Sequence, residues 1–181
     1  DDSYFGTSVF NHAKHRILWL LFLMLSATIT GTIISRYEET ISAIPLLVSF
    51  IPMLMDTGGN CGTQSSTLVI RGIATDEIRF SDLFKVAFKE SRIALIVGAA
   101  LAVVNGLRII VMYQDPRLAI LLGISLMCTV FLAELIGCLL PLLSKKVHLD
   151  PAIMAAPLIT TIVDTCSIII YFAIATHLFA L

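Results

Sequence analysis

Five stretches of apolar residues, each long enough to cross a lipid bilayer as a helix, make up most of the chain. A transmembrane helix needs about 20 mostly apolar residues, and these runs are separated by polar or charged links. None of them alternates apolar and polar residues as the strands of a membrane β-barrel do. The pattern predicts an all-α membrane protein with five transmembrane helices, over residues 17–35, 41–70, 93–113, 118–144 and 151–181.

The composition restricts the class of protein in the same way. Hydrophobic residues are 57% of the 181, charged residues are 14%, and mean hydropathy is +0.94. Soluble domains carry about 25% charged residues, and disordered chains combine low hydrophobicity with high charge. Both classes are excluded. The net charge of −1 provides no basic field for nucleic acid.

Lysine and arginine are unevenly distributed among the links, which predicts the orientation of the chain in the membrane. With the N-terminus in the cytoplasm, nine of these residues lie inside and three outside. We therefore expect residues 1–16 to be a cytoplasmic juxtamembrane segment, residues 17–181 to form the membrane domain, and the C-terminus to lie outside. The long link 71–92 predicts a short interfacial helix capped by Ser81, with one apolar face formed by Leu83, Phe84, Ala87 and Phe88.

Three acidic residues lie within the predicted spans: Asp56, Glu134 and Asp164. An ionisable side chain at the centre of a membrane helix costs about 2.5 to 3.5 kcal/mol on insertion scales. No lysine or arginine is expected at a comparable depth. Such acids line a water-filled cation path, or else they are protonated, hydrogen-bonded residues of the helix core.

Asp164 is predicted to lie deep in the last span, 13 residues after Pro151 and so about 20 Å along the helix. Thr160, Thr161 and Ser167 share its face. Ala156 extends that face, and Pro157 can leave a carbonyl free for an ion or water. Oxygen ligands of this kind suit Mg²⁺ or Ca²⁺ rather than soft metals.

The second predicted span is unusually polar. Asp56, Asn60 and Gln64 recur at four-residue steps and form one stripe, beside Gly59 and Thr63. The stripe either lines a wet pathway or supports close packing between helices. Pro45 and Pro141 predict kinks or helix ends. No Ser/His/Asp set or H-E-x-x-H motif is present, and we do not expect an enzyme.

These residues resemble a known family. Residues 56–64 (DTGGNCGTQ) and 67–74 (TLVIRGIA) resemble the second transmembrane helix of MgtE-type magnesium channels. Asp150-Pro151-Ala152, Pro157-Leu158 and residues 161–164 (TIVD) resemble the fifth. Two positions depart from the family pattern: Ala156 replaces a frequent Asn before the proline, and Glu134 stands where Asn is common.

The resemblance implies a homodimer in a bacterial inner membrane, with a pore on its twofold axis that takes hydrated Mg²⁺. It further implies cytoplasmic regulatory domains ahead of the membrane domain. The expected metal-site residues are Asp164, Asn60, Gly59, Thr161, Asp150 and Glu90, the last two near the cytoplasmic mouth. The expected pore-lining residues are Asp56, Gly58, Gln64, Ala156, Pro157 and Thr160.

The sequence thus predicts a channel or transporter that moves Mg²⁺ down its electrochemical gradient across the lipid bilayer. Two alternatives remain open at this point. One is a cation-coupled exporter of divalent metal ions, with Asp56 or Glu134 as the coupling carboxylate. The other is a membrane scaffold that transports nothing.

Overall fold

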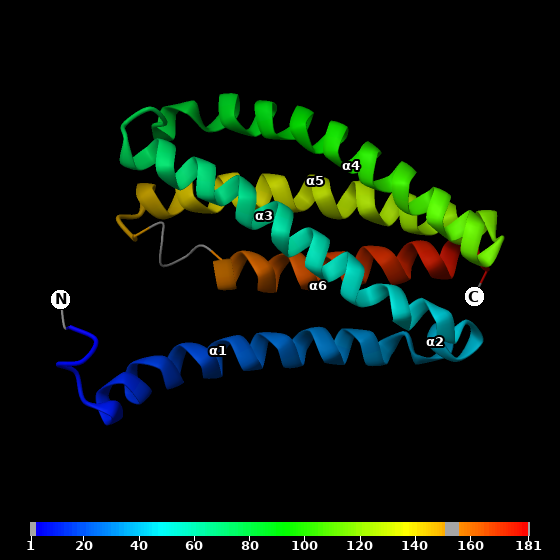
Figure 1. Cartoon of the computed structure of the whole chain (residues 1–181), viewed down its shortest axis with the longest axis horizontal. Coiled ribbons are helices and arrows are strands. Elements are labelled where there is room, and N and C mark those ends of the chain that lie inside the picture. Colours follow the sequence, from blue (N-terminus) through cyan, green and yellow to red (C-terminus); the bar gives the residue numbers. More distant parts are fainter. Residues whose placement is uncertain (1–2, 151–155, 181) are drawn as a thin grey trace.

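The fold of the chain is all-helical over the residues that the structure, a computed structural model, describes, which are 3–150 and 156–180. In chain order the elements are α1 (Val9–Arg36), α2 (Glu38–Ala43), the 3₁₀ helix η1 (Pro45–Phe50), α3 (Ile51–Ala74), the 3₁₀ turn η2 (Phe80–Asp82), α4 (Leu83–Tyr113), α5 (Pro116–Lys146) and α6 (Ala156–Leu178). The long helices alternate in direction, so the two termini lie at opposite ends of the bundle (Figure 1).

Four helices in the described part are long and apolar enough to cross a membrane. They cover Val9–Arg36, Phe80–Tyr113, Pro116–Lys146 and Pro157–Leu178. These correspond to four of the five predicted spans. α3 is not among them, because its 24 residues include the polar run from Asp56 to Thr67.

The second predicted span, 41–70, is wrong as a single helix. α2 ends at Ala43, Ile44 has φ −135° and ψ 81°, and the 3₁₀ helix η1 begins at Pro45. A residue before proline is pushed out of the helical region by the proline ring, so the chain must break here. α3 then runs to Ala74, four residues beyond the predicted end.

The predicted interfacial helix in the link 71–92 is also wrong. Residues 83–88 are the first turns of α4, and Asp82 rather than Ser81 is the N-cap residue. Leu83 packs against a core cluster formed by α3 and α5, whereas Phe84 is 84% exposed. The predicted apolar face is therefore divided between the core and the surface. No residue between Leu83 and Tyr113 ends the helix, so residues 83–88 belong to α4 and do not form a separate short helix.

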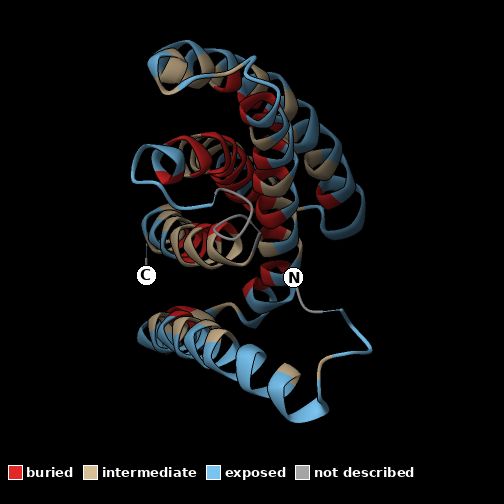
Figure 2. Ribbon diagram, turned by 90° about the vertical axis from the view of Figure 1, so that its left-hand side faces the viewer, coloured by how far each residue is buried: buried red, intermediate tan, exposed pale blue. Residues whose placement is uncertain are grey.

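The core lies between α3, α5 and α6, where the buried residues concentrate (Figure 2). α5 runs through the centre of the core. It continues past the buried Pro141, so this proline does not end the helix. α3 crosses α5 closely at Gly62 and Gly137. A Cβ atom on Gly137 would fall on the carbonyl oxygen of Gly62. Glycine at this crossing lets the two backbones touch.

α1 stands apart from the rest of the bundle along one edge (Figures 1 and 2). Its long-range packing is against α6, with a smaller contact to α2. Thr30 is the one buried residue among its 28. Such a helix, apolar on all sides and exposed, fits a lipid environment rather than water.

Candidate functional site

A groove between α3 and α6 contains the acidic residue predicted to be central. Its volume is about 390 Å³. We call it the Asp164 groove. Its lining is Ile51, Pro52, Met55, Asp56, Gly59, Asn60 and Thr63 from the 51–63 part of α3, with Thr160 and Asp164 from α6.

α3 presents its polar stripe to this groove because residues four apart share a helix face. Asp56 and Asn60 are exposed on the groove wall, whereas Gly58 and Cys61 point into the bundle and are buried. Gly59 lies against Thr160, whose side-chain atoms would be 3.6 and 3.7 Å from a Cβ atom at that position. The small residue therefore brings α3 and α6 together at the groove floor.

Asp164 contributes a carboxylate whose hydrogen bonding is incomplete. Its Oδ1 atom is buried and has no hydrogen-bond partner among the described residues. A buried polar atom without a partner costs free energy unless water or an ion satisfies it. The groove around it offers carboxylate, amide and hydroxyl oxygens, which are the ligand types that hard cations prefer.

A second hollow meets the same carboxylate from the side of α1. This lateral pocket has a volume of about 220 Å³. It is lined by Ala27, Thr30, Gly31 and Ile34 of α1 with Met55, Thr161 and Asp164. Met55 and Asp164 line both hollows. Asp164 therefore stands at the partition between the groove and the lateral pocket.

Thr161 lies in the lateral pocket rather than in the groove. Its hydroxyl donates to the carbonyl oxygen of Pro157 at 2.9 Å, so its proton is used within α6. The carbonyl that Pro157 can leave free is that of residue 153, four positions earlier, and it lies outside the described residues. Pro157 itself is partly exposed in the first turn of α6, and the side chain of Ala156 lies outside the described residues.

Two predicted pore-lining residues of α3 lie elsewhere. Gly58 is packed: a Cβ atom there would be 2.6 Å from Cγ1 of Val163 and 2.8 Å from Cγ2 of Thr129. Gln64 lies one turn beyond Asn60, in a separate open hollow with Thr63, Thr67 and Leu68. The stripe is therefore continuous along α3, but only its first two members reach Asp164.

Glu90 and Asp150 are not brought to the groove. Glu90 is 8% exposed on α4, where the Ser65 hydroxyl lies 3.1 Å from its Oε2 atom. The same hydroxyl lies 3.0 Å from the carbonyl oxygen of Glu134, whose side chain is buried beside Glu90. Asp150 is exposed in the link after α5. Glu134 thus belongs to a polar contact among α3, α4 and α5.

The described residues do not form a complete metal cluster by themselves. No group of three His, Cys, Asp or Glu side chains among them could hold an ion. The groove has two acids, Asp56 and Asp164, beside neutral oxygen donors. That set suits an ion that keeps most of its water shell, since Mg²⁺ loses water reluctantly.

Sequence reasoning missed Thr30 and Thr165. Their hydroxyl oxygens are 2.9 Å apart, and Thr165 also donates to the Thr161 carbonyl at 3.0 Å. The bond joins α1 to α6 directly beside Asp164. The only signal in the sequence is a set of hydroxyl residues at alternate positions in α1, and nothing in that spacing shows which one meets α6.

The fold and the groove together define a polytopic helical membrane protein with an acidic, oxygen-lined groove at the level of its spans. The sequence model of the MgtE family, described as a divalent cation transporter, matches residues 51–174. This match covers most of the chain, including the groove residues of α3 and α6. The chain belongs to the MgtE family of divalent cation transporters, and this is a family of transporters rather than enzymes.

Curated relatives agree with the family match. The magnesium transporter MgtE of Bacillus subtilis is 34% identical over 175 residues, which are 97% of this chain and 39% of that protein. The magnesium transporter MgtE of Thermus thermophilus is 36% identical over 162 residues, 88% of this chain and 35% of the relative. That of Enterococcus faecalis is 32% identical over 164 residues, 91% of this chain and 36% of the relative. The chain therefore spans between a third and two fifths of these relatives.

Proposed function

We propose that the chain forms the ion-conducting part of a magnesium channel and that Asp164 is the carboxylate that attracts the ion. The observation that carries this proposal is the unpartnered, buried Oδ1 atom of Asp164 in a groove lined by Asp56, Asn60 and Thr160. A protein that only packed helices would be expected to pair that oxygen. The names of the relatives support magnesium as the ion.

The chemistry of the groove suits a hydrated divalent ion. The Asp164 carboxylate supplies charge, while Asn60 and Thr160 supply neutral groups that hydrogen-bond to water ligands of the ion. A site of this kind attracts the ion without removing its whole water shell, so the ion can leave again. Gln64, one turn further along α3, would continue the polar wall toward the end of the helix that carries Arg71.

The exposed face of α3 supports a homodimer. Asp56, Asn60 and Gln64 are exposed on one face of a helix that packs against α5 and α6, two of the four apolar spans. Facing lipid, these groups would lack hydrogen-bond partners. A twofold axis along this face would place a second copy opposite, bring two Asp164 carboxylates to one pore and enclose the groove. α3 would then complete the set of five transmembrane helices. Its polar residues would face water in the pore.

The distribution of charge supports the orientation. The end of the bundle that holds the α3–α4 loop and the C-terminal turn of α5 carries Arg71, Lys89 and Lys145. By the positive-inside rule this end would face the cytoplasm of a bacterial inner membrane, with the N-terminus there and the C-terminus outside. Residues 1–16 would then lie on the cytoplasmic surface, and residues 17–181 would form the membrane domain. In the longer relatives, sequence beyond the matched part has room for regulatory domains.

The membrane potential is a sufficient driving force. A charge of +2 crossing about 100 mV releases about 4.6 kcal/mol, at about 2.3 kcal/mol per elementary charge. No coupled ion or chemical step is needed for entry of Mg²⁺. Glu90 and Asp150 remain predicted ion-binding residues at the cytoplasmic mouth, outside the Asp164 groove.

Flux measurements test this function. The chain in proteoliposomes should carry Mg²⁺ inward when a potassium diffusion potential makes the lumen negative. The flux should not change when a proton or sodium gradient is imposed at fixed potential. Flux that follows such a gradient would establish the coupled exporter instead, and flux no greater than in protein-free liposomes would contradict a channel.

A further inference from the structure

A separate cavity lies at the opposite end of α3 from the Asp164 groove. It has a volume of about 350 Å³. Its walls are the last turns of α3, the loop after it, and the first turns of α4. The residues that matter for its chemistry are Leu68 and Arg71 of α3, Glu77 of the loop, and Lys89, Glu90 and Ile93 of α4.

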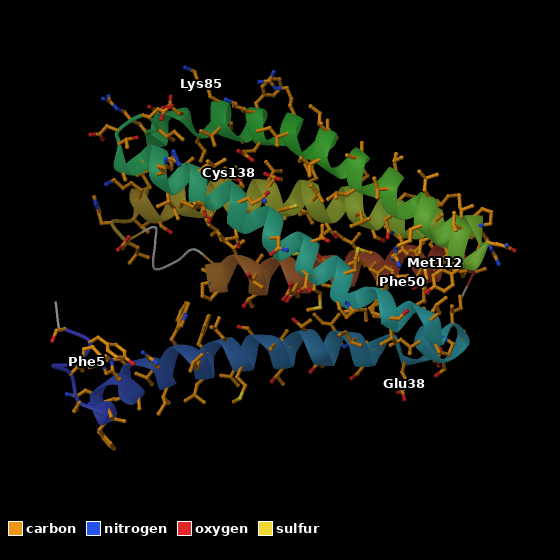
Figure 3. All side chains as sticks on the ribbon, in the orientation of Figure 1. Phe5, Glu38, Phe50, Lys85, Met112 and Cys138 are labelled. Atoms are coloured by element: carbon orange, nitrogen blue, oxygen red, sulfur yellow. The ribbon has the colours of Figure 1, made fainter. Side chains whose placement is uncertain are left out.

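The cavity lies at the depth of lipid headgroups. α4 has 31 residues and is about 46 Å long, whereas the hydrocarbon core of a bilayer is about 30 Å thick. The charged residues near its start, Lys85, Lys89, Glu90 and Arg92, end where the apolar run from Ile93 begins. The part of α4 that extends beyond the hydrocarbon therefore includes Lys89 and Glu90, which line the cavity. Lys85, one turn before Lys89, marks this end of α4 in Figure 3.

Two basic and two acidic side chains line the cavity. Arg71, Lys89 and Glu77 are exposed, whereas Glu90 is nine-tenths buried in the wall. Within the described part of the chain, these four side chains form no ion pair with one another. The charges of Arg71, Lys89 and Glu77 are thus available to a ligand, whereas the Glu90 carboxylate also faces the Ser65 hydroxyl and the side chain of Glu134. Leu68, 61% exposed, and Ile93 provide an apolar border on the side of the spans.

A ligand that matches this arrangement carries one anion and one cation on a short polar group joined to an apolar chain. We propose that the cavity binds the headgroup of a phosphatidylethanolamine-type lipid. Arg71 and Lys89 donate hydrogen bonds to the phosphate, and the primary ammonium donates to the carboxylates of Glu77 and Glu90. The acyl chains leave along Ile93 of α4 into the bilayer.

Other lipids of the same membrane fit less well. A phosphatidylglycerol headgroup carries a phosphate for Arg71 and Lys89 but no ammonium group. It would leave the carboxylates of Glu77 and Glu90 without a cationic partner. A phosphatidylcholine headgroup has the same charges but no N–H donor for the carboxylates. The cavity shares no lining residue with the Asp164 groove. Glu90 is also a predicted ion-binding residue, so the proposal is tested by lipid binding and not by flux.

Binding also has a structural consequence. Glu90 lies within hydrogen-bonding distance of Ser65 of α3, so a headgroup bonded to Glu90 joins α3 to α4 at this end. Arg71 lies on the same helix as the groove residues Asp56 and Asn60. The lipid would therefore stabilise the helix whose polar face lines the groove.

Native mass spectrometry of the detergent-purified chain, titrated with each lipid in turn, tests the proposal. We expect phosphatidylethanolamine to bind about tenfold more tightly than phosphatidylcholine, since hydrogen bonds to charged groups are lost in the latter. Glu77→Gln should lower the affinity for phosphatidylethanolamine toward that for phosphatidylcholine and leave the affinity for phosphatidylcholine unchanged, and Arg71→Gln should weaken both. Glu38→Gln, at the other end of the molecule, should change neither.

Three results would overturn the proposal. Equal affinity for phosphatidylcholine and phosphatidylethanolamine would remove the role of the carboxylates. Tighter binding of phosphatidylglycerol would show a purely anionic preference. Unchanged binding in Glu77→Gln, with the thermal unfolding of the variant also unchanged, would place the lipid elsewhere.

Discussion

The hydroxyl oxygens of Thr30 in α1 and Thr165 in α6 lie 2.9 Å apart. Thr165 has the Thr161 carbonyl at 3.0 Å, whereas the Ser26 carbonyl is 3.5 Å from the Thr30 hydroxyl, so the distances favour Thr30 as the donor in the pair. The bond joins the one buried residue of α1 to the residue that follows Asp164. It fixes the helix that forms the outer wall of the lateral pocket.

Removing this bond should loosen α1 from the bundle. Thr30→Val keeps the shape of the side chain and deletes the hydroxyl, and the loss should be about 0.6 kcal/mol and at most about 1.7 kcal/mol of unfolding free energy, the range of interhelical side-chain bonds in membranes. Thr28→Val is the matched control, because the Thr28 hydroxyl bonds only to Met24 of its own helix. Unfolding in detergent measures both. Equal losses in the two variants would show that the Thr30–Thr165 bond does not hold α1.

The α3–α5 crossing should not tolerate a methyl group. Gly137→Ala would press a Cβ atom onto the Gly62 backbone, and overpacking of this kind costs about 1 to 3 kcal/mol. Gly106→Ala in α4 adds the same atom where nothing lies within 4 Å, so it should be neutral or slightly stabilising. Thermal unfolding compares the pair. A Gly137→Ala protein as stable as Gly106→Ala would contradict the observed crossing.

The polar contact among α3, α4 and α5 should depend on one hydroxyl. Ser65→Ala leaves Oε2 of Glu90 without its serine donor, and an unsatisfied buried acceptor costs about 1 to 3 kcal/mol. The neighbouring Ser66 is equally buried but contacts only the carbonyl of Thr63 at 3.5 Å. Ser66→Ala should therefore cost less. Unfolding in detergent should give a lower free energy of unfolding for Ser65→Ala than for Ser66→Ala. The reverse order would contradict the role assigned to Ser65.

Water should reach the polar face of α3 but not the face beside it. A cysteine introduced by Asn60→Cys should react readily with a membrane-impermeant thiol reagent, and Mg²⁺ should slow that reaction. The native Cys61 is the internal control, since it is 6% exposed and points into the bundle. The rate at each position is read by mass spectrometry. Reaction at Cys61 as fast as at the introduced cysteine would show that the face is misassigned.

Much of this arrangement follows from spacing along the chain. The four-residue steps from Asp56 to Asn60 to Gln64 predict one polar stripe, and all three side chains are exposed on α3. Thr160 and Asp164, which the spacing places on one face of α6, line the same groove. Four of the five predicted spans are confirmed as candidates. These are local properties, fixed by helix periodicity and by the lengths of the apolar runs.

The parts that sequence did not reveal depend on which helices meet. Gly58 is as small and as central in the motif as Gly59, yet one packs against α5 and α6 while the other lines the groove. Thr30 cannot be distinguished from Thr28 or Thr32 without the position of α6. The helix end predicted at Pro45 is confirmed by the break at Ile44, whereas the length of the apolar run wrongly favoured one span over 41–70.

Replacement of the Asp164 carboxylate tests its role in ion conduction most directly. Asp164→Asn keeps the size of the side chain and removes its charge. Asp76→Asn is the matched control, an exposed loop residue at φ 58° where asparagine is well tolerated. In voltage-clamped proteoliposomes, we expect Mg²⁺ flux of Asp76→Asn to equal that of the unaltered chain and flux of Asp164→Asn to be lost. Full magnesium flux through a folded Asp164→Asn protein would contradict the assignment of Asp164 as the carboxylate that draws the ion into the pore.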